Sequence, residues 1–400
     1  MKKYHFFVIA GLLVMILVSC DKSPKLAVSP KEVTFDAYPE EEQTIDISAN
    51  VAWTATVKQT EEWLTIDPVQ GKGDAVMTLT ADENIEFTGR TALIIISGDG
   101  TQTDTIRVEQ TAGIDVAEEI EDEIFRKYCL NAYDVSPRDG KLSMKEVRVK
   151  MLIIKEMGIK SLAGIEYFSH LENLDCSFNL LKTIDISKNK ELVTLNCSYN
   201  PMTSIDVSEN EKLTTLNLCG MGLTGIDVRQ NTALRKLDIL FNPLKSLDVS
   251  NNKNLDYLNC NETQLTTLDV HANTKLKTLS CINNQLTVLD VSKNVLLEIF
   301  YCDQNSLSNL DIRQNTELEV LTCAGNQLQS LDVSRNVKLT KMFCNRNNLT
   351  GSMNLTSNSK LEEFDFRNNP LLNTIIIWQG FQPNNDKHRI DSPPTNYQYQ

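Results

Sequence analysis

Seven cysteines recur at multiples of 21 residues in the second half of the chain, and their thiols are the first side chains that could do chemistry: Cys176, Cys197, Cys260, Cys281, Cys302, Cys323 and Cys344. Thiolates bind zinc, and close thiols form disulfides. Leu218 and Ile239 fill the two places in the series that lack cysteine. Leu cannot replace a metal ligand, and neighbouring thiols with parallel Cβ vectors suit a bridge poorly. We therefore favour reduced, buried, inert cysteines over a disulfide or metal ladder.

A second series consists of eight aspartates with the same spacing: Asp185, Asp206, Asp227, Asp248, Asp269, Asp290, Asp311 and Asp332. Stacked carboxylates repel one another unless they are solvated or hydrogen-bonded. One interpretation is a row of cation sites. The other, which we favour, is that each carboxylate accepts a bond from a backbone N–H two residues on. Glycosidase chemistry needs two carboxyl groups in different environments, and a uniform row supplies only one.

Other catalytic signals are weak. The chain has four histidines, and none lies near a plausible Ser or Cys nucleophile pattern, nor is there a glycine-rich phosphate loop. The segment from Asp139 to Glu146 is similar to the end of an EF-hand calcium loop, but Val135 and Pro137 stand where the first and third ligands belong. The sequence leaves open whether this segment binds calcium. We otherwise predict a protein that is not an enzyme and has no cofactor and no metal.

These side chains belong to a 21-residue repeat, Leu-x-x-Leu-x-Cys-x-x-Asn-x-Leu-x-x-Leu-Asp-Val-Ser-x-Asn-x-x, which runs nine times from Leu171 to Lys360. A Cys-free unit from Val149 and a partial unit from Leu361 make eleven units over 149–371. A short fixed period predicts a solenoid. Counting the first Leu as offset 0, we expect the residues at offsets 0, 3, 10 and 13 to point inward. The Asn at offset 8 should bond backbone groups of the turn.

The outward offsets vary, and they carry six aromatic residues. Phe178, Tyr199 and Phe241 share offset 7, with Gly220 leaving a gap in their row. The others are at offsets 2 and 4, namely Tyr257, Tyr301 and Phe343. Aromatic residues aligned on one exposed face are typical of contact surfaces. We predict that these six residues bind the ligand; the alternative is a scatter of tolerated surface rings.

The sequence pattern of residues 24–112 differs from that of the repeats. Short runs of alternating apolar and polar residues are separated by Gly-rich turns, which indicates a β-sandwich. Trp53-Thr54-Ala55, Trp63-Leu64-Thr65-Ile66 and the closing Val108-Glu109-Gln110-Thr111-Ala112-Gly113 resemble a BACON domain. The resemblance implies a domain of bacterial surface proteins for which carbohydrate binding has been suggested. Trp53 and Trp63 could be sugar platforms, but we favour core positions. We accordingly favour a spacer role for the domain.

Two capping segments are expected at the ends of the repeats. Residues 113–148 should form a helical N-terminal cap, with Ile120, Ile124 and Tyr128 at four-residue spacing and Phe125 and Cys129 alongside. A capping box is expected from Ser143 to Glu146. Residues 372–400 should form a last strand, a loose cap and a tail. The fold class is therefore mostly β: an N-terminal β-sandwich, a short helical cap, and a solenoid with a parallel sheet on its concave face.

The first residues predict export. Two lysines precede an apolar run from Phe6 to Val18, which is typical of a signal peptide over 1–19. The run ends in Leu17-Val18-Ser19-Cys20, which resembles a bacterial lipobox. The resemblance implies lipidation of Cys20, with 20–23 as a tether. We expect the protein to be lipid-anchored in the cell envelope, at the outer membrane or cell surface.

Composition and resemblance together suggest a function. A net charge of −14 argues against nucleic acid and against electrostatic docking on anionic lipid, so the lipid anchor would be the only membrane contact. The repeats resemble the 21-residue bacterial leucine-rich repeats of the internalin J type. The resemblance implies a non-catalytic surface protein that binds a protein or glycan ligand on its solenoid face. The alternative is a carbohydrate-binding accessory protein in which the BACON-like domain is the binder.

Overall fold

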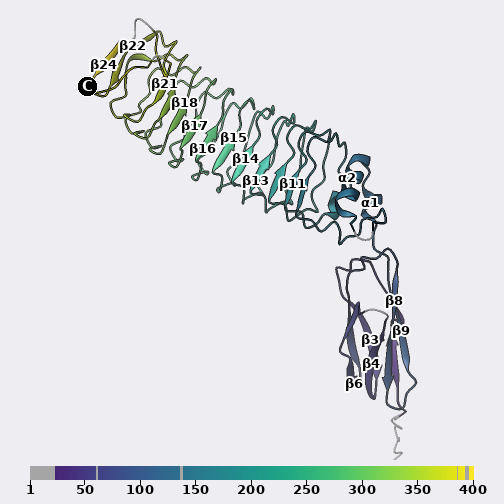
Figure 1. The fold of residues 1–400 in the computed structure, drawn as a ribbon. Helices are drawn as coiled ribbons and strands as arrows, with labels where there is room; N and C mark the ends of the chain where they lie inside the picture. Colours follow the sequence, from purple (N-terminus) through teal and green to yellow (C-terminus); the bar gives the residue numbers. More distant parts are fainter. Residues whose placement is uncertain (1–22, 60–61, 136–137, 385, 392–395) are drawn as a thin grey trace, which may run out of the picture. The chain divides into compact units, whose positions relative to one another are not determined.

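The computed structural model describes residues 23–59, 62–135, 138–384, 386–391 and 396–400. The signal-like segment, Cys20 and Pro137 lie outside the described residues. The chain divides into two compact units between Ile114 and Asp115. Each unit is described by itself (Figure 1).

The first unit is a sandwich of two sheets, as the alternating strands predicted. One sheet has the order β1-β3-β7-β5 and the other the order β2-β9-β8-β4-β6. The strands are β1 (Leu26–Ser29), β2 (Glu32–Phe35), β3 (Gln43–Ala49), β4 (Ala52–Lys58), β5 (Leu64–Asp67), β6 (Gln70–Lys72), β7 (Ala75–Ala81), β8 (Arg90–Gly98) and β9 (Asp104–Gln110). All pair antiparallel except β2 with β9. The alternation of buried and exposed residues along β3, β4 and β9 puts one face of each strand in the core.

Both tryptophans of the sandwich are core residues, as we favoured. Trp53 and Trp63 are each 2 % exposed. The Trp53 indole N–H donates to the Gly73 carbonyl at 3.0 Å. A Cβ at Gly71 would lie 2.5 Å from the Trp53 ring, so the ring packs where only glycine leaves room. Neither indole can serve as an exposed sugar platform.

The second unit begins with two helices, α1 (Val116–Glu119) and α2 (Glu123–Tyr133). Asp122 caps α2 by accepting from the Ile124 and Phe125 N–H groups at 2.9 and 3.0 Å. Phe125 and Cys129 face the core, whereas Ile124 is 43 % exposed. The predicted apolar series was therefore wrong at Ile124, whereas Ile120 is buried and Tyr128 packs against the core. Asp122 starts α2 two residues after Ile120, so the two isoleucines do not share one helix.

The helical segment still covers the first end of the repeats. Ile120, Phe125 and Cys129 belong to the same buried cluster as the repeat leucines, and the Phe125 and Phe168 rings lie 6.1 Å apart. The predicted capping box forms in part: Ser143 donates through its N–H and its hydroxyl to the Glu146 carboxylate, both at 2.9 Å. No helix follows, because Ser143–Glu146 closes only a turn.

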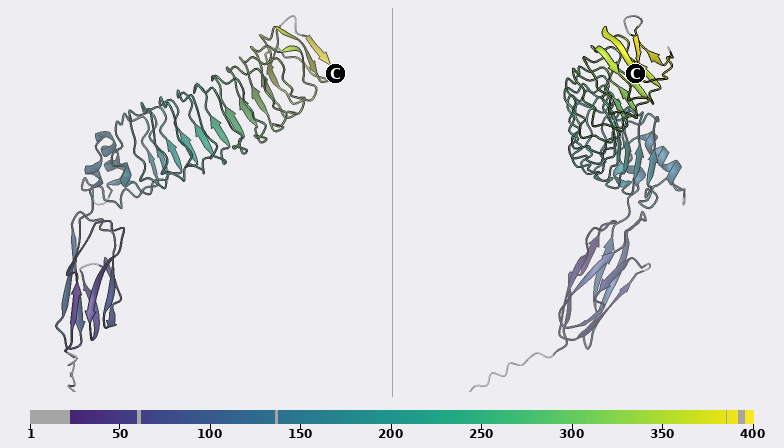
Figure 2. Two further views of the ribbon diagram at one scale, coloured as in Figure 1. Left: turned by 180° about the vertical axis from the view of Figure 1, so that it is seen from behind. Right: turned by 90° about the vertical axis from the view of Figure 1, so that its left-hand side faces the viewer.

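The eleven repeat units and one strand of the C-terminal segment form one parallel sheet of twelve strands (Figures 1 and 2). The strands are β10 (Met151–Ile153), β11 (Asn173–Asp175), β12 (Thr194–Asn196), β13 (Thr215–Asn217), β14 (Lys236–Asp238), β15 (Tyr257–Asn259), β16 (Thr278–Ser280), β17 (Ile299–Tyr301), β18 (Val320–Thr322), β19 (Lys341–Phe343), β21 (Glu363–Asp365) and β23 (His388–Arg389). A 3₁₀ turn, η1, spans Ile165–Tyr167. Each repeat places offset 3 opposite offset 3 of the next, as in Leu174 opposite Leu195. The predicted fold class is confirmed.

The core of the solenoid contains further positions of the repeat besides the leucines. The expected offsets 0, 3 and 10 are buried in every full repeat, and so is the Cys offset. Offset 13 is only half-buried from Ile184 to Leu247 and becomes buried from Leu268 onward. The residue two places later, Val or Ile, is buried throughout and was missed: Ile186, Val207, Val228, Val249, Val270, Val291, Ile312 and Val333. The second half of the motif therefore also packs inward.

Two ladders of buried asparagine satisfy backbone groups. At offset 8, as predicted, Asn284 donates to the carbonyls of Cys260 and Cys281 and accepts from the Leu265 N–H, all within 3.0 Å. A second ladder at offset 18 was not predicted. Its member Asn294 donates to the carbonyls of Val270 and Asn273 at 2.9 Å. The ladders tie each repeat to the one before it.

The C-terminal segment is more ordered than the loose cap we expected. Strand β23 adds a twelfth strand to the main sheet, and β20 (Thr350–Asn354), β22 (Leu371–Ile377) and β24 (Asn396–Tyr399) form a separate parallel sheet. Phe381 lies 5.0 Å from Trp378, 4.7 Å from His388 and 5.5 Å from Tyr397 between ring centroids. This aromatic cluster closes the apolar end of the solenoid.

Candidate functional site

The cysteine ladder is structural. Each of the nine described cysteines is free and buried. In two sulfur pairs one thiol donates to the next without a disulfide, Cys176 to Cys197 at 3.4 Å and Cys323 to Cys344 at 3.1 Å. Burial raises the pKa of Cys260 to about 12, so its thiol stays protonated and unreactive at neutral pH. The expected burial of these thiols is confirmed.

The aspartate row is structural as well. Each of the eight carboxylates accepts from the backbone N–H two residues on, for example Asp185 from Ser187 at 2.9 Å. That bond is the main reason why the pKa of Asp185 lies below its usual range. His271 bridges two members, with Nδ1 2.8 Å from Asp269 and Nε2 3.1 Å from Asp290. In the described parts of the chain no group of three His, Cys, Asp or Glu side chains could hold a metal ion.

The offset-7 aromatics lie just beyond the strand ends, in left-handed backbone conformation. Phe178, Tyr199 and Phe241 have φ values of 56°, 55° and 59° and are 53, 41 and 47 % exposed. The Phe178 and Tyr199 rings stack at 4.5 Å with an interplanar angle of 17°. A Cβ at Gly220 would lie 2.8 Å from the Tyr199 ring. The predicted gap at Gly220 is thus covered by Tyr199, and Phe241 stands apart.

The other three predicted aromatics are half-buried, and only two of them come together. Burial raises the pKa of Tyr257, whose hydroxyl lies near the Asp238 and Asn259 side chains. Tyr301 and Phe343 line one hollow of about 400 Å³ on the sheet face, by which we mean the surface formed by offsets 4 and 6. The rest of its lining is Ile282, Asp303, Thr322, Ala324, Asn345, Asp365 and Arg389. Ligand binding by the six aromatics stays a prediction.

The hollow owes its shape to one small residue between two large ones. Tyr301, Thr322 and Phe343 end strands β17, β18 and β19 and stand opposite one another in the sheet register. Adjacent strands are ~4.8 Å apart, so the backbones that carry the two rings are separated by about 10 Å. Thr322 and, two residues on, Ala324 form the floor between them. We call this space the 301–343 slot.

One carboxylate of the slot has no cationic partner among the described residues. Asp303 accepts from the Thr322 hydroxyl and from the Ala324 N–H, the latter at 2.8 Å. Burial raises its pKa, which shows that these two bonds do not offset the loss of water. Asp365, by contrast, pairs with Arg367 at 2.6 Å and lies 3.9 Å from Arg389.

The residues that line the slot beside the two aromatics were missed in the sequence. A signal existed: Asp303 is an acid at offset 6, where the neighbouring repeats have Ile282 and Ala324. The sequence also shows an aromatic residue, a small residue and an aromatic residue at offset 4 of three successive repeats. The sequence did not show that the chain after Leu372 returns to the sheet and places Arg389 opposite Asp365.

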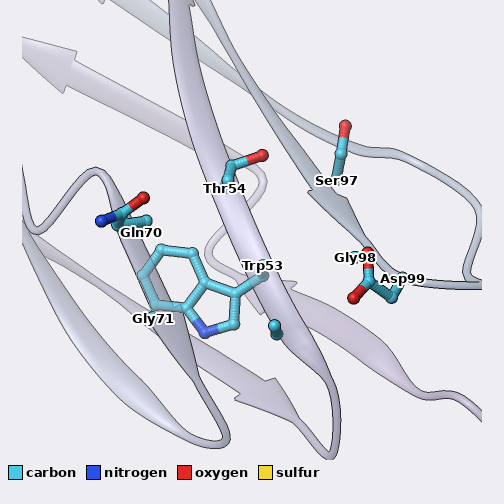
Figure 3. Close-up of a pocket in the computed structure, with 8 residues that line it drawn as sticks. Trp53, Thr54, Gln70, Gly71, Ser97, Gly98 and Asp99 are labelled. Carbon is cyan, nitrogen blue, oxygen red and sulfur yellow. The ribbon is translucent and has the colours of Figure 1, made fainter.

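A second hollow of about 460 Å³ lies on the sandwich unit (Figure 3). Its lining includes Thr54, Gln70, Ser97 and Asp99 together with the edge of the Trp53 ring. Figure 3 shows the indole lying over Gly71, while the Ser97 and Asp99 side chains lie away from it. The polar groups of this hollow could bond a sugar, but without an exposed ring to stack on.

None of the described helices is long and apolar enough to cross a membrane.

Comparisons with known proteins agree with the two-unit organisation. The family described as "Viral BACON domain" matches residues 25–113. The functional domain of internalin J from Listeria monocytogenes, which includes a cysteine ladder, is 30 % identical; the match covers 71 % of each chain with a TM-score of 0.60. Internalin F from Listeria monocytogenes is 18 % identical over 71 % of this chain and 97 % of its own, with a TM-score of 0.58. No curated protein matches.

Proposed function

Since this chain belongs to the internalin J-type leucine-rich-repeat proteins, we propose that it is a non-catalytic binding protein whose sheet face binds a protein ligand. The observation that carries the proposal is the 301–343 slot, where two aromatic side chains and a half-buried carboxylate meet on the sheet face. Binding surfaces concentrate their energy in such partly buried aromatic pockets. The offset-7 rings would form a second contact on the same side of the repeats.

The alternative is that the sandwich binds carbohydrate and the solenoid is a scaffold. The hollow lined by Thr54, Gln70 and Asp99 favours it, while the burial of both tryptophans weighs against it. Exposed aromatic stacking surfaces are available on the repeats instead.

Two sets of variants separate the candidates on the same protein. The chain from residue 24 onward is tested on an array of secreted and surface proteins and on a glycan array. We expect a protein ligand whose affinity falls about 30-fold or more with Tyr301→Ala/Phe343→Ala, which is ~2 kcal/mol at an anchor. The triple variant Phe178→Ala/Tyr199→Ala/Phe241→Ala tests the second contact. Circular dichroism checks that each variant folds.

The matched control lies on the other unit. The variant Thr54→Ala/Gln70→Ala/Asp99→Ala changes only exposed polar side chains and should leave the protein ligand bound. A glycan ligand lost with this control and kept by both aromatic variants would contradict the proposal and support the alternative.

We further propose that the protein is exported and lipid-anchored at the outer membrane or cell surface. The support is the signal-like segment and the lipobox-like Leu17-Val18-Ser19-Cys20. Even two lipid signals anchor a protein stably, and a lipidated Cys20 would carry three acyl chains.

The variant Cys20→Ala tests the anchor. Without the thiol, diacylglyceryl transfer cannot occur, so we expect uncleaved precursor or soluble protein in place of a detergent-extracted lipoprotein. Membrane fractionation, with the mature size read on a gel, is the measurement. Mature-sized Cys20→Ala protein that still fractionates with membranes would show that Cys20 is not the anchor.

A further inference from the structure

The 301–343 slot has a chemical character that narrows the proposed function. We infer that the slot receives one cationic side chain, a lysine or an arginine, from the protein ligand, with Asp303 as its counter-ion. The inference rests on the proposal that the sheet face binds a protein.

Charge is the first argument. Asp303 is half-buried, and its two bonds come from neutral donors, the Thr322 hydroxyl and the Ala324 N–H. None of the described lysines, arginines or histidines forms an ion pair with it. A half-buried carboxylate that lacks a cationic partner gains from a ligand cation, because part of its desolvation has already occurred in the free protein.

The walls are the second argument. Tyr301 and Phe343 flank the floor of the slot on either side, about 10 Å apart at the backbone. Two van der Waals contacts of ~3.5–4 Å leave room for a single layer between the rings. An aliphatic stem or a planar guanidinium is one layer thick, and aromatic faces attract cations.

The other charges nearby do not compete for the ligand. Asp365 is engaged by Arg367 through two guanidinium nitrogens, at 3.0 and 2.6 Å. Arg389 stands opposite Asp365 on strand β23, three strands beyond Thr322, and its Nε–H donates to the Asp386 carbonyl at 3.1 Å. The net charge of −14 also favours a basic partner over an acidic one.

A neutral sugar fits these observations less well. Sugar sites use carboxylates as hydrogen-bond acceptors, but a sugar would leave the negative charge of Asp303 uncompensated in a partly dehydrated slot. Ring walls alone do not discriminate between the two ligand classes, so the charge of Asp303 decides.

Defined probes test the inference on the chain from residue 24 onward. The probes are N-acetyl-arginine amide and its neutral isostere N-acetyl-citrulline amide, with cellotetraose as a neutral sugar. Binding is followed by NMR of Tyr301 and Phe343. We expect the arginine derivative to bind at least about tenfold more tightly than the citrulline derivative. The variant Asp303→Asn, which keeps an acceptor for Ala324, should reduce that ratio to about one.

A matched control removes one charge elsewhere on the same face. Asp238 also lies on the sheet face, where it accepts from the Cys219 thiol at 2.9 Å. Asp238→Asn changes the net charge as Asp303→Asn does, so it should leave the arginine-to-citrulline ratio unchanged. An equal loss in both variants would mean non-specific attraction and would overturn the inference. A variant Asp303→Asn with altered circular dichroism is replaced by Asp303→Glu, which should keep the ratio above one.

The remaining outcomes separate this inference from the proposed function. If arginine and citrulline derivatives bind equally, or if cellotetraose binds more tightly than either, the cationic slot is wrong. The sheet face would still be a binding surface if Tyr301→Ala/Phe343→Ala abolishes binding of an identified protein. If that variant binds the protein as the parent does, the proposed function fails at this site as well.

Discussion

Replacing Asn347 with alanine should lower the free energy of unfolding by about 3–5 kcal/mol. Asn347 is 3 % exposed. It donates to the carbonyls of Cys323 and Cys344 at 2.9 and 3.1 Å and accepts from the Leu328 N–H at 3.0 Å. Alanine leaves the Leu328 N–H without a partner inside the solenoid, which costs roughly 1–3 kcal/mol. It also removes one of two donors from each carbonyl, since Asn326 and Asn369 donate to Cys323 and Cys344 as well, at roughly 0.5–1.5 kcal/mol for each lost bond. Urea unfolding followed by circular dichroism measures the change.

The neighbouring residue is the control. Asn348 has the same side chain, but it is exposed, so Asn348→Ala should change the free energy of unfolding by less than about 0.5 kcal/mol. Because a repeat array can unfold in parts, the urea m-value is compared among the three proteins. Equal losses for the two variants would contradict the role of the offset-8 asparagine.

The second large effect is alkaline unfolding driven by the cysteine ladder. Burial raises the pKa of Cys260 from 9.0 to about 12. The folded state therefore holds the proton more tightly than the unfolded state. That contribution to stability is complete below about pH 9 and is lost as pH rises toward about 12. At pH 10.5 the loss is about 2 kcal/mol for this thiol.

Burial or a neighbouring thiol also raises the pKa of other members of the ladder: Cys197, Cys281, Cys302 and Cys344. Each of these thiols therefore adds a loss of stability of the same sign to that of Cys260 as the pH rises above about 9. We expect the solenoid to lose stability progressively above about pH 9 and to unfold in alkaline solution. Circular dichroism and thiolate absorbance should change together.

A single variant isolates the contribution of one thiol. In Cys260→Ala the drop in unfolding free energy between pH 8 and 10.5 should be smaller than in the parent by about 2 kcal/mol. Val270→Ala is the control, since it removes buried volume at 0 % exposure without a titrating group; its drop should match that of the parent. If Cys260→Ala and Val270→Ala show the same drop as the parent, the ladder does not couple protonation to folding.

The sequence alone determined the architecture because a solenoid repeats one local solution. The 21-residue period places Leu174 beside Leu195 in register. The exchange of Cys for Leu218 and Ile239 predicted buried thiols, since one offset meets the same surroundings in every repeat. The Asp-to-backbone bonds, such as Asp185 to Ser187, followed from residues two apart. All these inferences concern neighbours along the chain or at the fixed period.

Only the tertiary structure showed those features that depend on the direction of a side chain or on a departure from the repeat. Phe178, Tyr199 and Phe241 share one offset, yet only the first two stack, because Tyr199 covers Gly220. The second asparagine ladder was in the motif, but its inward direction follows from the backbone path after Val270 and its equivalents. Helix α2 begins at its Asp122 cap, so Ile124 turns outward.

The candidate site shows the same division. Tyr301 and Phe343 were identified from the sequence because aromatics at an outward offset are visible in the pattern. Asp303 was not, because its importance depends on burial and on the lack of a cation, and both are properties of several strands together. Sequence periodicity sets which residues share a face, whereas the free energy of a charge is set by everything that packs around it.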